Sequence, residues 1–163
     1  MGLKESGLRA SLRNVSTGVV SIPDSVVSRP DDNNDTTFGG GKDGLTISIT
    51  EPYESIQGRI SSNTENQETA FLQESDGTVI DSVDISSLSP TDVFTFDDVN
   101  ISAGQYDIVL DTGSNFVNGF FNGSFELPIS SADGVISIES RFDQSPEETE
   151  LLPRIVEVGN INL

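Results

Sequence analysis

Apolar and polar residues alternate in short runs along most of the chain. The clearest run is L-T-I-S-I-T at 45–50. Further runs of this kind, some of them weaker, lie at 55–61, 69–73, 78–85, 93–96, 105–111, 115–121, 134–140 and 154–158. A period of two is typical of β-strands with one buried face, and Gly, Pro, Asn and Asp separate the runs. The pattern predicts an all-β fold, an antiparallel sandwich or jelly roll of about 8–10 strands.

One segment has the signals of a helix instead. In S-P-E-E-T-E-L-L at 145–152, Ser145 is placed to cap the first turn and Pro146 suits the first helical position. Glu148 completes a capping box, and Pro153 stops the helix. The sequence therefore predicts one short helix before the last strand.

The first 29 residues differ from the rest in charge. They hold four basic and two acidic residues, whereas residues 30–163 hold four basic and 25 acidic ones. Such asymmetry suggests a segment with its own partner. The spacing of the apolar residues fits a short helix, and the Gly and Ser residues fit an extended arm equally well. We expect residues 1–29 to dock onto a partner or a sister subunit. The candidate docking residues are Leu3, Leu8, Arg9, Leu12, Arg13, Val15 and Ile22.

Residues 30–44 are rich in Gly and Asp, which break regular structure, so we interpret them as a linker. The sandwich is then expected over 45–163. Within the linker, Asp31, Asp32 and Asp35 raise the possibility of a calcium site, since hard cations prefer carboxylate oxygens. The segment lacks the register of an EF-hand loop. In a chain this acidic such clusters also arise by chance, and we predict no metal site.

Charge and composition exclude several classes of function. The chain has 27 acidic and 8 basic residues, a net charge of −19, and such a surface repels nucleic acid and anionic lipid. Without Cys or His it has neither a disulfide framework nor the usual general base and zinc ligand, so we expect no cofactor. High salt screens this self-repulsion, which favours a halophilic source. An acidic mesophilic domain is the alternative.

The stretch I-V-L-D-T-G-S at 108–114 matches the catalytic loop of aspartic proteases. Those enzymes need two aspartates that share one proton, so a single Asp111 would require a homodimer. The apolar-apolar-Gly segment that should follow is poor, because Glu157 interrupts it. Asp, Gly and Ser also suit an ordinary strand end and turn. We interpret the stretch as a turn and expect no catalytic residue, with a dimeric aspartic protease as an alternative.

A second candidate site lies in N-F-V-N-G-F-F-N-G-S-F at 115–125. Aromatic rings beside amides can bind sugars, because a ring stacks on the pyranose and amides bind hydroxyls. The alternative is a strand whose rings face the core. The possible ligand residues are Phe116, Asn118, Phe120 and Asn122.

Two longer stretches resemble known proteins. L-K-E-S-G-L-R-A-S-L-R-N-V-S-T-G-V at 3–19, followed by I-P-D-S-V-V at 22–27, resembles the N-terminal segment of structural proteins from tailed viruses of haloarchaea. In those proteins it precedes variable β-rich domains, often lectin-like. Residues 82–111 are similar to jelly-roll domains of viral and cell-surface proteins.

The resemblance implies a virion component, such as a tail fibre, a baseplate protein or a capsid-surface protein, assembled in a high-salt archaeal cytoplasm. It also implies docking to other virion proteins through residues 1–29 and a homo-oligomer, for example a trimer. No membrane insertion is expected. The alternative role is an adhesin that binds a host glycan or S-layer protein, although no lectin-type ligand set is recognisable in the sequence.

Overall fold

The computed structural model describes residues 25–28, 34–38, 41–60, 68–111, 116–120, 127–143 and 155–161. This part of the chain contains twelve strands and no helix, and hence no helix that could span a membrane. The strands are β1 (Val26–Ser28), β2 (Asn34–Phe38), β3 (Lys42–Ile49), β4 (Ile56–Ile60), β5 (Thr69–Glu74), β6 (Val79–Asp84), β7 (Val93–Phe96), β8 (Gly104–Asp111), β9 (Phe116–Phe120), β10 (Ile129–Ser130), β11 (Ile136–Asp143) and β12 (Ile155–Gly159).

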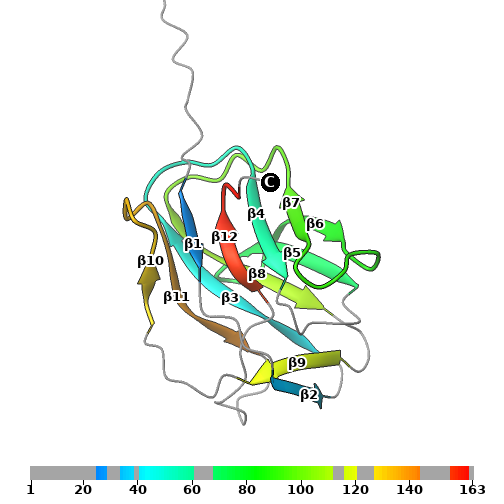
Figure 1. The fold of residues 1–163 in the computed structure, drawn as a ribbon. Coiled ribbons are helices and arrows are strands. Elements are labelled where there is room, and N and C mark those ends of the chain that lie inside the picture. Colours follow the sequence, from blue (N-terminus) through cyan, green and yellow to red (C-terminus); the bar gives the residue numbers. More distant parts are fainter. Residues whose placement is uncertain are drawn as a thin grey trace, which may run out of the picture.

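Two antiparallel sheets pack face to face (Figure 1). One has the order β1-β12-β4-β7 and the other β10-β11-β3-β8-β5-β6. Four pairs define the topology: β1 with β12, β3 with β8, β4 with β7, and β5 with β6. The chain is thus wound as one long hairpin across two sheets, which is the strand order of a jelly roll, with β10 and β11 added beside β3. The predicted all-β sandwich is confirmed, and each predicted run overlaps a strand.

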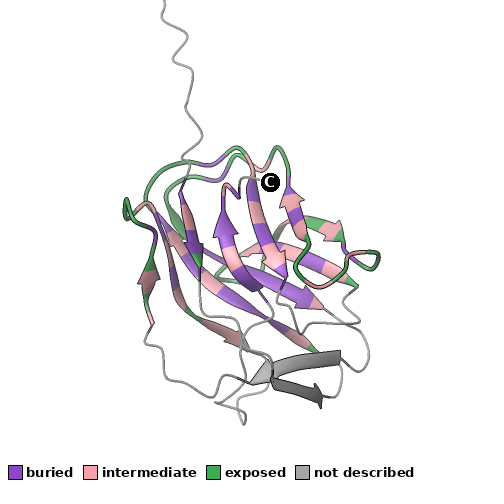
Figure 2. Cartoon of the chain, in the orientation of Figure 1, coloured by how far each residue is buried: buried purple, intermediate pink, exposed green. Residues whose placement is uncertain are grey.

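The core lies between the inner faces of the two sheets (Figure 2). Strand β4 alternates buried and half-buried residues, as expected when one face packs inward. Phe94 and Phe96 of β7 enter the core as an edge-to-face pair, with ring centroids 5.5 Å apart. Hydrophobic burial of these alternating residues is the main stabilising term of the fold.

The structure adds strands where the sequence predicts none. Strand β1 lies inside the predicted arm, β2 lies inside the predicted linker, and β10 has only two residues. Strand β3 begins at Lys42, before the predicted start of the sandwich. These segments are too short or too polar to show a period, and partner strands satisfy their backbone groups instead. The predicted helix at 145–152 lies outside the described residues.

The sandwich has two ends, defined by the direction of β3. The first, called here the arm end, holds Ser25 and the loops at 50–55, 97–103 and 131–135; backbone hydrogen bonds such as Thr50 N to Val135 O join its loops. The opposite, distal end holds Lys42, its register partner Asp111 and the segment after β6. Strand rise places Ile49 about 24 Å from Lys42. Strands β2 and β9 form a separate pair near the distal end (Figure 1).

Candidate functional surfaces

Ser25 fixes the start of β1 at the arm end. Its hydroxyl donates to Oδ2 of Asp133 in the turn between β10 and β11. Its carbonyl accepts a hydrogen bond of 3.1 Å from the Asn160 amide. Gly159 lies against it so closely that a Cβ there would be 2.1 Å from the Ser25 carbonyl oxygen. Ser25 is therefore anchored from both sheets.

Asp133 is the acceptor at the centre of this cluster. Oδ1 accepts hydrogen bonds from Ser131 Oγ at 2.7 Å and from the Val135 amide at 3.1 Å. The hydrogen bonds from Ser25, Ser131 and Val135 lower the pKa of Asp133 to about 2, because they stabilise the carboxylate. Asp133 is therefore ionised over the physiological range and is a poor proton acceptor.

Tyr53 lies beneath the same cluster, with 1% of its surface exposed. Burial raises the pKa of Tyr53. The Ser25 hydroxyl lowers this pKa, and the negative charges of Asp133 and Glu51 raise it further. Its hydroxyl faces Ser25 without a hydrogen bond of standard geometry. Nothing here activates Ser25 as a nucleophile, since the chain has no His and Asp133 is a weak base. The arrangement is suited to holding the chain in place.

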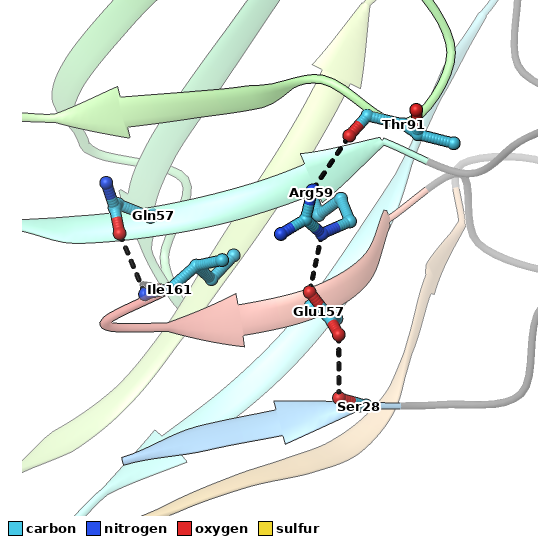
Figure 3. A network of polar contacts seen from close by, with 6 residues as sticks. All are labelled: Ser28, Gln57, Arg59, Thr91, Glu157 and Ile161. Carbon is cyan, nitrogen blue, oxygen red and sulfur yellow. Dashed lines mark hydrogen bonds and ion pairs between the residues drawn. The ribbon is translucent and has the colours of Figure 1, made fainter. Parts of the chain in front are cut away.

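A polar ladder crosses the outer face of the four-stranded sheet (Figure 3). Ser28 Oγ donates to Glu157 Oε1 at 3.3 Å, and Arg59 Nε donates to Glu157 Oε2 at 2.6 Å. Arg59 Nη1 also donates to the Thr91 carbonyl at 3.0 Å. Separately, Gln57 of the same strand as Arg59 accepts a hydrogen bond from the Ile161 amide at 2.8 Å. Ser28, Glu157 and Arg59 are joined side chain to side chain, which makes the ladder a structural feature of this sheet.

On the outer face of the six-stranded sheet, side chains of β3 and β5 meet across the strand between them, β8. Val109 points outward, on the opposite face from its buried neighbours in β8, yet it has 0% exposure. Lys42 Nζ of β3 lies 5.1 Å from the ring centroid of Phe71 in β5, although β8 runs between these strands. With strands about 4.8 Å apart, the Lys42 stem must extend across β8. The Lys42 stem and the Phe71 ring therefore lie on the same outer face as Val109, the register partner of Phe71.

Asp111 ends β8 at the distal end. Its carboxylate lies 3.9 Å from Lys42 Nζ, and 30% of the side chain is exposed. Its carbonyl accepts from the Glu68 amide at 2.9 Å. Asp111 is thus paired with a lysine, whereas a protease aspartate lies beside a second carboxyl and shares a proton with it. The predicted turn at 112–114 lies outside the described residues.

The other predicted site residues fall mostly outside the described part. Phe116, Asn118 and Phe120 belong to β9, whereas Asn122 lies outside. Asp31, Asp32 and every docking residue named for the arm also lie outside the described residues. Asp35 lies in β2 opposite Gly119 of β9, so the structure pairs part of the predicted linker with the predicted ligand segment. Among the described residues, no group of three or more acidic side chains could hold a metal ion.

The sequence offers little signal for the cluster at the arm end. The D-G dipeptide at 133–134 predicts the turn that carries Asp133, but Ser25 lies 108 residues away along the chain. No pattern in a single sequence connects the two. Tyr53, in the loop at 50–55, likewise belongs to no run of alternating apolar and polar residues.

Comparison with known proteins identifies no relative: no family model, no curated protein and no solved structure matches the chain. The functional argument therefore depends on the strand order, the charges and the contacts described above.

Proposed function

We propose that the chain is a non-enzymatic structural protein of a haloarchaeal tailed-virus particle, in a tail fibre, baseplate or capsid surface. In this role the N-terminal arm docks to other virion proteins and the sandwich faces solvent. The observation that carries the proposal is the jelly-roll strand order, because this fold recurs in viral capsid and lectin domains. Fold alone does not determine function. The resemblance of residues 3–27 to virion proteins supplies the second support.

The excess of carboxylates over cations among the described residues supports a high-salt setting. Lys42, Arg59 and Arg141 each lie against a carboxylate, at 3.9, 2.6 and 3.3 Å respectively. Acidic residues far outnumber these cations within the described ranges, so the surface carries a large excess of negative charge. In molar salt the Debye length falls to about 3 Å, which screens repulsion between these carboxylates.

The contacts of β1 support an earlier end for the proposed docking arm. Val26–Ser28 pair with Gly159, Val158 and Glu157, and Val27 is 1% exposed in the core. These residues belong to the sandwich although they fall within 1–29. The docking segment proper is therefore residues 1–24, and a truncation that tests docking should end there.

The decisive experiment examines purified particles of the virus that encodes the chain. Mass spectrometry and immunogold microscopy with an antibody to the sandwich should find the chain on the particle surface. A tagged variant lacking residues 1–24, supplied in trans, should fold and fail to incorporate, whereas the tagged full-length chain should incorporate. Absence of the chain from particles would overturn the proposal. Saturable binding of the truncated variant to haloarchaeal cells in molar salt would instead support the adhesin role.

A further inference from the structure

Strand β6 is the longest of the four strands that end the two sandwich sheets. The other three, β1, β7 and β10, have three, four and two residues, whereas β6 has six. An edge strand presents backbone N–H and C=O groups that can pair with a strand of another molecule. Short edges offer few such groups, so β6 is the sandwich edge most suited to strand addition.

The hydrogen bonds to β5 show which amides of β6 point outward. The Ile85 amide donates to the Glu68 carbonyl at 3.0 Å, in register with the residue pairs along the strand. Amides alternate in direction along an antiparallel strand. The Val83 amide therefore also faces β5, whereas the amides of Ser82 and Asp84 point to the open edge. Both of these residues are exposed, although β7 of the other sheet lies nearby.

Carboxylates of β6 accept hydrogen bonds from two amides along this edge. The Ser82 amide donates to Oδ1 of Asp81 at 2.8 Å. Immediately after the strand, the amide and hydroxyl of Ser86 donate to Oδ1 of Asp84 at 2.9 and 2.7 Å. An incoming strand would have to displace the Asp81 carboxylate to reach the Ser82 amide.

Asp81 also lies on the wrong face of β6 for an extended sheet. Its register partner in β5 is Leu72, which is fully buried, and register partners share a face. A bulge adjoins this pair, since the register shifts between Leu72 and Gln73. Bulges and inward-pointing charges are both devices that prevent edge-to-edge association of sheets. Continuing the sheet beyond β6 would bury the charge of Asp81, which costs free energy.

The rest of β6 would favour strand addition. The segment V-I-D-S-V-D at 79–84 holds three β-branched apolar residues, a composition typical of strands. Val79 is 51% exposed. A charge within such a segment acts as a gatekeeper, because it opposes the pairing that the neighbouring residues promote.

We propose that Asp81 keeps the edge of β6 closed to a second copy of the chain. Its carboxylate occupies the outward amide of Ser82 and places a charge where an added strand would bury it. Without Asp81, the β6 strands of two copies should pair antiparallel and join their six-stranded sheets. This inference does not depend on the virion role. It implies that any assembly of native chains uses a surface other than this edge.

Asp81→Thr in the full chain tests the proposal, because threonine removes the charge and suits a strand. Asp97→Thr is the matched control, since it removes one charge from an exposed loop. Sedimentation velocity is measured over a range of protein concentrations in about 1 M KCl, where repulsion between acidic copies is screened. Asp81→Thr should form a species of twice the parent mass that increases with concentration, and Asp97→Thr should sediment like the parent.

A second substitution locates the contact. Proline is tolerated where an edge amide faces outward, and it removes the donor that an added strand needs. Ser82→Pro, combined with Asp81→Thr, should therefore restore the parent mass. Asp81→Asn keeps the shape of the side chain without its charge, and it should dimerise at higher concentration than Asp81→Thr. It replaces Asp81→Thr in the test if that variant does not fold.

Three results would overturn the proposal. The first is a parent-like mass at every concentration after Asp81 is replaced. The second is equal dimerisation of Asp97→Thr, which would assign the effect to net charge. The third is a dimer that persists when Ser82→Pro is added, which would place the contact elsewhere on the molecule.

Discussion

Arg141 Nε lies 3.3 Å from Oδ1 of Asp43, so that β11 and β3 are joined by an ion pair as well as by their backbone ladder. The side chains of Arg141 and Asp43 are only 17% and 3% exposed. The same Oδ1 accepts a 2.8 Å hydrogen bond from the Gly44 amide. Desolvated charges of this kind are tolerated only with their partner present.

Replacing Arg141 with Met should therefore lower the free energy of unfolding by about 3 kcal/mol, since it leaves the Asp43 charge buried without this cation. Arg59→Met is the matched control. The Arg59–Glu157 pair is 28% and 30% exposed, and partly exposed pairs contribute at most about 1 kcal/mol. Urea unfolding of both variants in the same salt measures the difference. Equal losses would show that burial of the first pair is unimportant.

Acid should remove the contribution of Asp133. Its folded pKa of about 2 lies below the ordinary aspartate value of 3.8, so its share of stability is present above about pH 4. That share disappears as the pH falls from about 4 to about 2. An Asp133→Asn variant should be less stable than the parent at pH 7, and the gap should close over this range. Thermal unfolding of both proteins between pH 7 and 2 gives the comparison, and a constant gap would contradict it.

Gly159 should be intolerant of a side chain. Its φ is +134°, and an added Cβ would meet the Ser25 carbonyl oxygen at 2.1 Å, so Gly159→Ala combines backbone strain with a displaced β1. Gly134 also has a positive φ, +73°, but open space around it, and its alanine variant should lose about 1 kcal/mol. Gly41→Ala, with neither constraint, should be near neutral. The order of the three unfolding midpoints tests the close approach at Ser25.

Two truncations should separate the arm from the sandwich. Removing residues 1–24 should leave the free energy of unfolding almost unchanged, because β1 and Ser25 remain. Removing residues 1–28 also deletes the buried Val27 and exposes β12 as a sheet edge. That second loss should be at least about 2 kcal/mol. If both truncations unfold like the full chain, β1 does not belong to the cooperative unit.

Salt should stabilise the protein. The net charge of −19 generates repulsion that is larger in the compact state than in the unfolded chain, and molar KCl screens it. The melting temperature should rise steadily from about 0.2 to about 3 M KCl. The Debye length falls to about 3 Å, the separation of two charges in direct contact, near 1 M salt, which lies between these two concentrations. A flat or falling profile would favour the mesophilic alternative.

Much of the sheet structure could be predicted from the chain. The period of two in β3, β4 and β7 follows directly from burial of one strand face, and the predicted run at 93–96 coincides with β7. The three-residue β1 and the polar β2 could not be predicted this way. Their backbone groups form hydrogen bonds with β12 and β9, each more than 70 residues away along the chain. The local sequence of β1 or β2 does not indicate which distant strand it will pair with.

By itself, the sequence determined the fold class, most of the strands, the acidic surface and the absence of histidine and cysteine chemistry. Alternation, turn residues and composition act locally, and each can be read without knowing which strands pair. The tertiary structure alone decided the jelly-roll order, the attachment of β1 to the sandwich and the meeting of Ser25, Tyr53 and Asp133. Those depend on contacts between distant segments, which form only when both sheets bury their inner faces together.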